Sequence, residues 1–377
     1  MHEKQKLITK WIENAKWSPS GGNLQPWLFI LDFDNSQNSL DIITLHLVLN
    51  PNAIKERSPL DVSGTASLIS LGCITTSIKH IAALDSYRLE IEVIEKDHSY
   101  VDTSIKLTFI QDLSLKNHQF KLDHILNRST NREPFKKKKI DENITKELVS
   151  ILESFANLKL FNILNKKDFF KIYKEIEKIR WKNNQYVDSL FTEINFKEKT
   201  HEFSNKIPLS QLGLSFIDKL FFGGLNHFIF LRRICQFLLA DLLVFKSLKN
   251  YRSKGSEIFF LQAKTHDVKS LFELGCLFQE IWLLTEKNHL AFQPLGTSLI
   301  MASQVIQDDT LNLTSKENDQ IKKIISNLNK ISGENFNYFT LGFRIGYPTK
   351  KTKRSPRKEL NSIVKIINKL FILKNSA

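Results

Sequence analysis

Four segments of this sequence combine residue types that suit a planar, phosphorylated and mostly apolar cofactor. The first is the turn PSGGNLQPW at residues 19–27, which follows an apolar stretch with helical spacing. Its small residues Pro19, Ser20 and Gly21 would let the backbone approach a ring closely, and the amide of Asn23 could address a polar ring edge. The simpler alternative is a helix that ends at a glycine stop.

Two further segments supply fixed positive charge. Arg128 and Arg132 are four residues apart, with Ser129 between them. On an early helical turn both guanidinium groups could converge on one anion, for which phosphate is the natural guest. Near the C-terminus, Arg354 and Arg357 follow an apolar run of strand length and add more positive charge. Solvated basic surface is the alternative for both segments.

The fourth segment, LAFQPLGT at residues 290–297, follows a long stretch with helical spacing. It joins apolar residues to a turn formed by Pro294, Leu295 and Gly296. Such a turn could present backbone N–H groups to a heteroatom of a ring. An ordinary connecting loop is the alternative.

Several catalytic motifs are missing from the chain. There is no GxGxxG after a strand-like run, no GxxxxGK[ST], no HExxH and no GxSxG. Nucleotide-fold dehydrogenases, P-loop NTPases, zincins and α/β-hydrolases therefore have no local support. The ten histidines show no ligand spacing, so we expect no metal site.

The composition indicates a soluble globular protein. With 377 residues, of which 42% are hydrophobic, the chain can bury a substantial core. Three widely separated cysteines, Cys73, Cys235 and Cys276, predict reduced and buried thiols. The N-terminus lacks the apolar core of a signal peptide, which favours the cytoplasm.

The formal charge of +14 raises the question of nucleic acid. The lysines are spread through every segment, however, and the two dense basic runs at 136–139 and 350–354 lie beside the arginine segments. We therefore expect solvated surfaces and a small phosphate ligand, with no nucleic-acid partner.

Hydrophobic periodicity predicts the helices and strands of an α+β protein. The expected helices are residues 5–17, 63–84, 141–156, 168–191, 214–249 and 267–286. The expected strands are residues 27–31, 42–49, 88–94, 104–109 and 339–345, with a loop at 196–211 and a turn at 291–296. We expect an internal boundary near residue 120, because the chain then resembles a fresh start.

The most apolar region, residues 220–245, is interrupted by Arg232, Arg233 and Asp241. It therefore lacks the roughly 18 uncharged residues that a transmembrane helix needs. We expect a buried helical pair here, and an interfacial helix or a hydrophobic substrate entrance is the alternative.

Together, the four segments resemble motifs of the FMN-dependent nitroreductase family. That family has a PSxxNxQPW turn, an RxSxR-like start, a late Pro-Leu/Ile-Gly turn and a basic motif after a GYP-like strand end. In ordinary members, which are about half this length, the arginine motif precedes the turn, whereas here it follows the turn. The inverted order resembles the internally duplicated branch of the family, in which one chain mimics the usual homodimer.

The resemblance implies a nitroreductase-like α+β fold, a β-sheet flanked by helices, with residues 1–120 and 121–377 as two related halves of an intramolecular pseudo-dimer. One FMN would lie between the halves. The residues implied for its phosphate and ribityl tail are Arg128, Ser129, Arg132 and Arg357, with Arg354 as a weaker candidate. The residues implied for its ring are Pro19, Ser20, Gly21 and Asn23 from the first half and Pro294, Leu295 and Gly296, near N5, from the second.

The resemblance also implies a function. A reduced donor such as NAD(P)H would deliver hydride to flavin N5, and an electron-poor small molecule would then take it, with no side chain acting as an obligatory acid or base. The alternative is a flavin-storing or flavin-sequestering protein with little turnover, in which the surplus helices at 168–191 and 214–249 cover the flavin. A third hypothesis is a basic membrane-surface protein that uses residues 220–245. The chain would act as a monomeric pseudo-dimer or as a homodimer.

Overall fold

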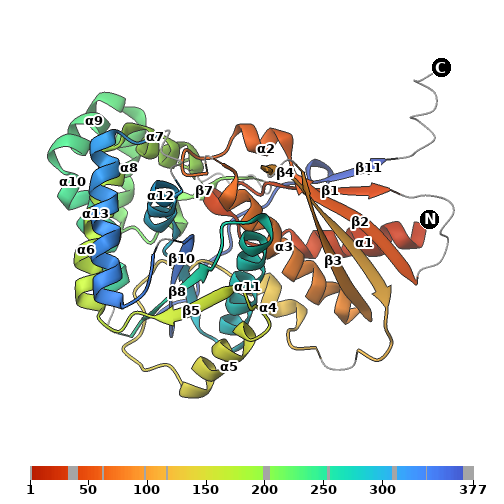
Figure 1. The fold of residues 1–377 in the computed structure, drawn as a ribbon. Helices are drawn as coiled ribbons and strands as arrows, with labels where there is room; N and C mark the ends of the chain where they lie inside the picture. The colour runs from red at the N-terminus through yellow and green to blue at the C-terminus, as the bar shows by residue number, and fades with distance from the viewer. Residues whose placement is uncertain are drawn as a thin grey trace.

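The computed structural model of the chain describes residues 2–32, 41–61, 63–96, 99–115, 118–197, 204–252, 255–307, 312–336 and 338–367. It is a mixed α/β structure in which two main sheets are flanked by helices (Figure 1). The strand order is β11-β1-β2-β4-β3 in the first sheet and β5-β8-β10-β9 in the second, with a small parallel pair β6-β7 apart from them.

The first sheet is built by the N-terminal part of the chain. Its elements are α1 (His2–Ala15), β1 (Trp27–Asp32), β2 (Ile42–Leu49), α2 (Pro51–Lys55), α3 (Thr65–Leu84), β3 (Tyr87–Lys96) and β4 (Ser99–Gln111). Alternation along β2 buries Ile43, Leu45 and Leu47 and leaves the intervening side chains partly exposed. This period of two is that of a sheet with only one face packed on the core.

The second sheet repeats this plan with later segments. Its elements are α4 (Leu122–Asn127), α5 (Glu142–Leu152), β5 (Leu158–Asn162), β8 (Glu257–Ala263), α11 (Val268–Lys287), β9 (Ala291–Pro294) and β10 (Thr340–Gly346). In both sheets two strands precede a helix of 20 residues, two strands follow it, and the spatial order is first, second, fourth, third. All of these pairings are antiparallel.

Additional elements interrupt the second sheet. Between β5 and β8 come α6 (Lys166–Lys182), α7 (Asn184–Glu193), β6 (Ile194–Asn195), β7 (Ile207–Pro208), α8 (Phe216–His227), α9 (Ile229–Leu238) and α10 (Ala240–Leu248). Between β9 and β10 come α12 (Gly296–Ile306) and α13 (Ser315–Ser332). Phe259 and Leu261 of β8 face the core that contains α3 and α11, whereas Ile258 and Phe260 face the core of the added helices. Both faces of the second sheet are therefore covered.

The two central helices, α3 and α11, pack against each other between the sheets (Figure 1). A Cβ atom at Gly72 would lie 2.1 Å from the carbonyl oxygen of Phe272, and one at Gly275 would lie 2.0 Å from the carbonyl oxygen of Ile69. The contact is reciprocal, as at an interface with two-fold symmetry. Only glycine allows the two backbones to approach this closely.

Several sequence-based predictions are confirmed. The strand at 42–49 and the helix at 267–286 agree with β2 and α11 to within one residue. Cys73, Cys235 and Cys276 are buried free thiols. Within the described ranges, α3 alone is long and apolar enough to cross a membrane, but most of it is buried inside the protein.

Other predictions were wrong in detail. The helix expected at 168–191 is two helices, because Asn183 starts a new one by accepting hydrogen bonds from the backbone N–H groups of Gln185 and Tyr186. Residues 291–296 are not a turn: residues 291–294 form β9, which pairs with β10, and Gly296 begins α12. The strand at 339–345 is not the last, because β11 (Val364–Ile367) follows it and pairs in parallel with β1.

The apolar region at 220–245 is not a buried helical pair. It forms parts of three short helices, and many of its large apolar side chains are exposed. The charged residues show which way the segment faces: Arg232 is buried against the protein, whereas the apolar residues beside it are exposed.

Candidate functional site

The turn after α1 has an unusual backbone. Gly22, Asn23 and Gln25 all have positive φ angles, of 57°, 63° and 52°. The hydroxyl of Ser20 accepts a hydrogen bond from the backbone N–H of Gln25 at 2.9 Å and holds the turn closed. Glycine and asparagine are the residues that tolerate this conformation best, which explains their presence in the sequence. The turn presents Gly21 and Gly22 to a cavity.

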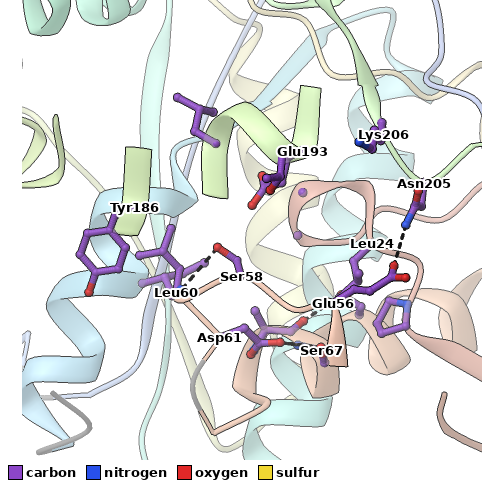
Figure 2. Close-up of a pocket in the computed structure, with 18 of the residues that line it drawn as sticks. Leu24, Glu56, Ser58, Leu60, Asp61, Ser67, Tyr186, Glu193, Asn205 and Lys206 are labelled. Atoms are coloured by element: carbon purple, nitrogen blue, oxygen red, sulfur yellow. Dashed lines mark hydrogen bonds between the residues drawn. The ribbon is translucent and has the colours of Figure 1, made fainter. Parts of the chain in front are cut away.

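That cavity has a volume of about 520 Å³, within the range of small-molecule sites. It lies between the turn, the beginning of α3, helices α6 and α7, and α12, which contributes Ile300. Figure 2 shows Asp61 and Ser67 on one side of the space and Glu193 on the other. The predicted ring-facing glycine turn and the helix that begins at Gly296 thus flank one cavity.

Carboxyl groups in the cavity were not expected from the sequence. Asp61 is buried and accepts hydrogen bonds from the backbone N–H groups of Ala66, at 2.7 Å, and Ser67, at 3.2 Å, at the start of α3. Burial raises the pKa of Asp61 against the opposing effect of these hydrogen bonds. Burial also raises the pKa of Glu193, which accepts a hydrogen bond from the hydroxyl of Ser189. Both groups therefore hold a proton more readily than in water. The sequence signal for Asp61 is its position just before a helix start.

Three arginines meet around Trp17, at the end of α1. Arg128 donates to the carbonyl oxygen of Trp17 at 2.6 Å and stacks on Trp282, 4.2 Å from its ring centroid. Arg357 donates to the same carbonyl oxygen at 3.1 Å. The guanidinium of Arg354 lies 3.7 Å from the centroid of the Trp17 ring. The structure therefore brings together three of the four arginines predicted from the sequence.

The charge of this arginine cluster is offset only in part among the described residues, because Glu286 acts on Arg128 from beyond ion-pair distance. Among the described residues, no carboxylate lies within ion-pair distance of Arg128, Arg354 or Arg357. Burial lowers the pKa of Arg128 to about 10. Burial, followed by repulsion from Arg128 and Arg354, lowers the pKa of Arg357 well below its usual value. Within the same residues, Nε of Arg128 is buried without a hydrogen-bond partner. An unpaired donor amid excess positive charge is suited to an anion.

Arg132 does not follow Arg128 on a helical turn, so the helical geometry expected for their convergence was wrong. Helix α4 ends at Asn127, and Thr130 forms a bridge to Phe292 of β9, so the arginine segment is extended. Four residues of extended chain span roughly 13 Å, whereas four residues of helix span about 6 Å. Arg132 instead donates to the carbonyl oxygen of Gln211 at 3.0 Å.

Ser129 lies near the cluster. Its hydroxyl is 2.9 Å from that of Thr352, two residues before Arg354 in the sequence. Because one hydroxyl of the pair donates to the other, the pair leaves the arginine cluster one hydroxyl hydrogen that can be donated to an anion.

In the turn of Pro294, Leu295 and Gly296, the backbone N–H of Leu295 is already engaged within the protein. Leu295 is buried, and its backbone N–H donates to the carbonyl oxygen of Gly342 at 2.7 Å. The hydroxyl of Tyr173 donates to the carbonyl oxygen of Leu295 at 3.3 Å. The Leu295 N–H is therefore unavailable to a ring, and the segment acts by starting α12.

The cavity and the arginine cluster adjoin each other. Arg357 donates to Oδ1 of Asn23 at 2.8 Å, and Asn23 donates to the carbonyl oxygen of Lys206, a cavity residue, at 3.3 Å. Along α3, Ser70 lines the cavity, and the carbonyl oxygen of Cys73 accepts a hydrogen bond at 3.5 Å from the hydroxyl of Ser18, the residue after Trp17. Ser70 and Cys73 are separated by about 4.5 Å along the helix axis.

Residues 204–211 cross the site as a cover, which contains β7 and a short 3-10 helix. Gln25 donates to the carbonyl oxygen of Ser204 at 3.0 Å, and Gln211 donates to that of Arg354 at 2.7 Å. This part of the expected loop therefore touches both predicted ends of the site. Residues 198–203 of that loop lie outside the described residues.

The sequence matches no protein-family model and no curated protein. Among solved structures, the chain is similar to the FMN-dependent nitroreductase NfnB from Mycobacterium smegmatis in complex with NADPH, with 12% identity, a TM-score of 0.36, and coverage of 65% of this chain and 97% of that one. A mutant of an FMN- and NADPH-dependent nitroreductase NfnB from sphigopyxis sp. strain HMH matches with 13% identity, a TM-score of 0.35, and coverage of 64% and 96%. An FMN-dependent nitroreductase from Clostridium difficile R20291 matches with 13% identity, a TM-score of 0.29, and coverage of 61% and 92%. A likeness this distant does not by itself place the chain in a family.

Proposed function

We propose that this protein is an FMN-binding oxidoreductase of the nitroreductase type. The observation that carries the proposal is the arginine cluster of Arg128, Arg354 and Arg357, which has no carboxylate partner among the described residues and adjoins a cavity of about 520 Å³. A phosphorylated ligand with a bulky uncharged ring matches both features. The similar solved structures are described as FMN-dependent, which agrees with the proposal.

The residues present fit FMN in part. The buried, unpartnered Nε of Arg128 and the exposed guanidinium of Arg354 would hold the phosphate, with Ser129 beside them. Gly21 would line the ring cavity. When bound, FMN would supply hydride chemistry between a reduced donor such as NAD(P)H and an electron-poor acceptor. The chain's own contribution is to orient the ring against α12 and to limit the access of water.

Asn23, Arg132 and Arg357 fit less well as direct ligands. All three donate to protein oxygen atoms and, unlike Arg128, none of them has a buried donor without a partner among the described residues. Arg357 in particular satisfies the carbonyl groups of Lys16, Trp17 and Ser18 at the end of α1. We propose that Arg357 positions the glycine turn and adds to the positive potential, while Arg354 and Arg128 contact the phosphate.

We also propose that residues 1–120 and 121–377 are related halves of an intramolecular pseudo-dimer. The repeated strand order and the reciprocal contact of Gly72 and Gly275 support this proposal. The pairing of β11 with β1 supports it as well, because the C-terminal segment completes the sheet of the other half. The arginine segment occurs only in the second half and the glycine turn only in the first, so the chain would form one FMN site.

A second candidate function is flavin storage with little turnover. It is favoured by the cover at residues 204–211, which hydrogen-bonds to Gln25 and Arg354, and by helix α7, which forms one wall of the cavity. Such a cover would keep a nicotinamide from reaching the ring. Helices α6 and α7, which the structure has in place of the single helix expected at 168–191, both line the cavity and would belong to the cover.

Phosphate recognition can be tested with Arg354→Ala and the matched control Lys353→Ala, since both side chains are exposed neighbours. Each variant would be titrated with FMN and with riboflavin, which lacks the phosphate. Losing a charge-assisted contact of roughly 1.5–3 kcal/mol should weaken FMN binding by about tenfold or more in Arg354→Ala. Riboflavin affinity and the control should be unchanged. Equal FMN affinity in all proteins, or no flavin binding at all, would refute the proposal.

Turnover can be separated from storage by the absorbance spectrum of the FMN-loaded protein under anaerobic conditions. Rapid bleaching of the flavin on addition of NADH or NADPH supports the oxidoreductase. A flavin that is bleached only by dithionite supports storage.

A further inference from the structure

Helices α8, α9 and α10 expose an unusual amount of apolar surface. Thirteen large apolar side chains between residues 216 and 245 have exposed fractions from 37% to 83%. They are Phe216, Ile217, Leu220, Phe228, Ile229, Phe230, Leu231, Ile234, Phe237, Leu238, Leu239, Leu242 and Phe245. Figure 1 shows these helices at the end of the molecule away from the first sheet. We call this set the α8–α10 surface.

The size of the α8–α10 surface exceeds what a soluble monomer usually shows. Its five phenylalanines are exposed by 75%, 64%, 78%, 83% and 53%. At roughly 200 Å² for a whole aromatic side chain, these five alone expose on the order of 700 Å². The largest apolar patch on a typical monomer is about 300–600 Å² in total.

In α9 the distribution of polar and apolar side chains is the reverse of that in a surface helix whose apolar side packs on its own protein. Its buried side is polar: Arg232 pairs with Asp188 at 2.9 Å, and Gln236 donates to the carbonyl oxygen of Trp181 at 3.2 Å. Its outward side carries Phe230 and Phe237, which are 78% and 83% exposed. Buried polar groups with exposed aromatic rings indicate that the outward side is adapted to a second, apolar environment.

The charge of the chain points to the identity of that environment. The net charge of +14 attracts an anionic lipid surface and opposes the approach of a second copy of the chain. Residues 216–249 contain five lysines and arginines and two aspartates. The aspartates, Asp218 and Asp241, are paired with Lys246 and Lys178, and the two arginines are paired with Asp188 of α7. The attraction to an anionic surface therefore comes mainly from the net charge of the whole chain.

We propose that the α8–α10 surface docks on the surface of an anionic lipid bilayer, with its phenylalanines in the interfacial layer. The three helices have 12, 10 and 9 residues. At 1.5 Å per residue they are roughly 14–18 Å long, which is too short to span a hydrocarbon core of about 30 Å. They therefore lie on the membrane and do not cross it.

The docked surface is connected to the cavity through α7. The ring of Phe191 on α7 stacks on Phe222 of α8 with centroids 5.8 Å apart, and Asp188 of α7 binds Arg232 and Arg233 of α9. The same helix contributes Glu193 to the cavity wall. Docking would therefore bring α7, and with it one wall of the cavity, close to the bilayer, whether or not the ligand is FMN.

The test is flotation of the full chain with two kinds of vesicle. One consists of phosphatidylcholine alone, and in the other about 30% of the lipid is anionic phosphatidylserine. The protein should float with the anionic vesicles, and binding should weaken as salt is raised. The double variant Phe230→Ser with Phe237→Ser should lose at least tenfold in binding. The control, Leu113→Ser with Leu164→Ser, removes two side chains that are 76% and 88% exposed elsewhere and should bind as before.

Absence of binding to both vesicle types would overturn the proposal, and so would equal losses in the two double variants. A dimer in light scattering that the phenylalanine variant abolishes, with no vesicle binding by the unmodified protein, would assign the surface to a second copy instead. Far-UV circular dichroism of each variant would confirm that all of them remain folded.

Discussion

The contact between α3 and α11 allows a sharp prediction, because a single methyl group should disturb it. A Cβ atom at residue 72 would lie 2.1 Å from the carbonyl oxygen of Phe272 and 2.8 Å from the backbone nitrogen of Cys276. Both obstacles belong to the backbone, so no side-chain rotation can relieve them. In Gly72→Ala the two helices must therefore separate by roughly 1 Å to restore ordinary contact distances.

The expected cost follows from two opposing terms. Overpacking a core with one extra carbon costs about 1–3 kcal/mol, and a backbone obstacle favours the upper end. Alanine gains about 1 kcal/mol over glycine within a helix. The free energy of unfolding should therefore fall by roughly 2 kcal/mol. With an unfolding entropy of about 2.1 cal/mol/K per residue, Tm should fall by roughly 2–3 °C.

The assay is denaturant unfolding and calorimetry of Gly72→Ala beside Gly223→Ala. Gly223 lies in α8, and a Cβ atom there would meet nothing within 4 Å. This control should gain about 0.5–1 kcal/mol from helix propensity alone. Gly275→Ala should behave like Gly72→Ala, and the double variant should cost less than the two singles together, because one separation relieves both clashes. If Gly72→Ala were as stable as Gly223→Ala, the close approach of the helices would be refuted.

Further predictions concern individual buried groups. Burial raises the pKa of Asp61 in the folded protein, so the stability that this group contributes is present below its unfolded pKa of about 3.9 and is lost as pH rises through the folded pKa. The stability of Asp61→Asn relative to the unmodified protein should therefore improve as pH rises from roughly 4 to 8. A difference in Tm that stays constant over this range would contradict the prediction. Arg357→Ala removes the donor to the carbonyl groups of Lys16 and Ser18 and one of the two donors to that of Trp17, and should cost roughly 3 kcal/mol or more in urea unfolding. Arg354→Ala should cost less than about 1 kcal/mol. Similar losses in the two variants would contradict the positioning role of Arg357. Burial raises the pKa of Cys276 to about 12, so it should react with a thiol reagent only after unfolding, and rapid labelling of the native protein would show that the thiol is accessible.

Local patterns in the sequence were enough to predict many elements of the fold. The alternation of residues 42–49 and the apolar spacing of residues 267–286 correspond to β2 and α11, because both periods arise from the chain's own geometry. The turn at 19–23 was recognised from its small residues, whereas its positive φ angles are a finding of the structure. The segment of Arg128 was recognised by two arginines four residues apart with a serine between them, and that of Arg354 and Arg357 by positive charge after an apolar run.

The positions of these groups relative to each other depended on tertiary structure. Pairing of Thr130 with Phe292 holds the arginine segment extended, so Arg128 reaches Trp17 while Arg132 reaches Gln211. The pairing of β11 with β1 joins segments that are more than 300 residues apart, and no local pattern reports such a partner.

The acidic side of the cavity and the orientation of the faces of α9 also depend on tertiary structure. Asp61 and Glu193 lie on segments far apart in sequence, and only the packing of α7 near the start of α3 brings them to one cavity. Sequence periodicity predicts that α9 has an apolar side, but it does not say whether that side faces the protein or the surroundings. Side-chain type and spacing are local properties of the chain. Burial depends on which distant segments pack against each face of a helix or strand, and these segments come together only when the whole chain folds.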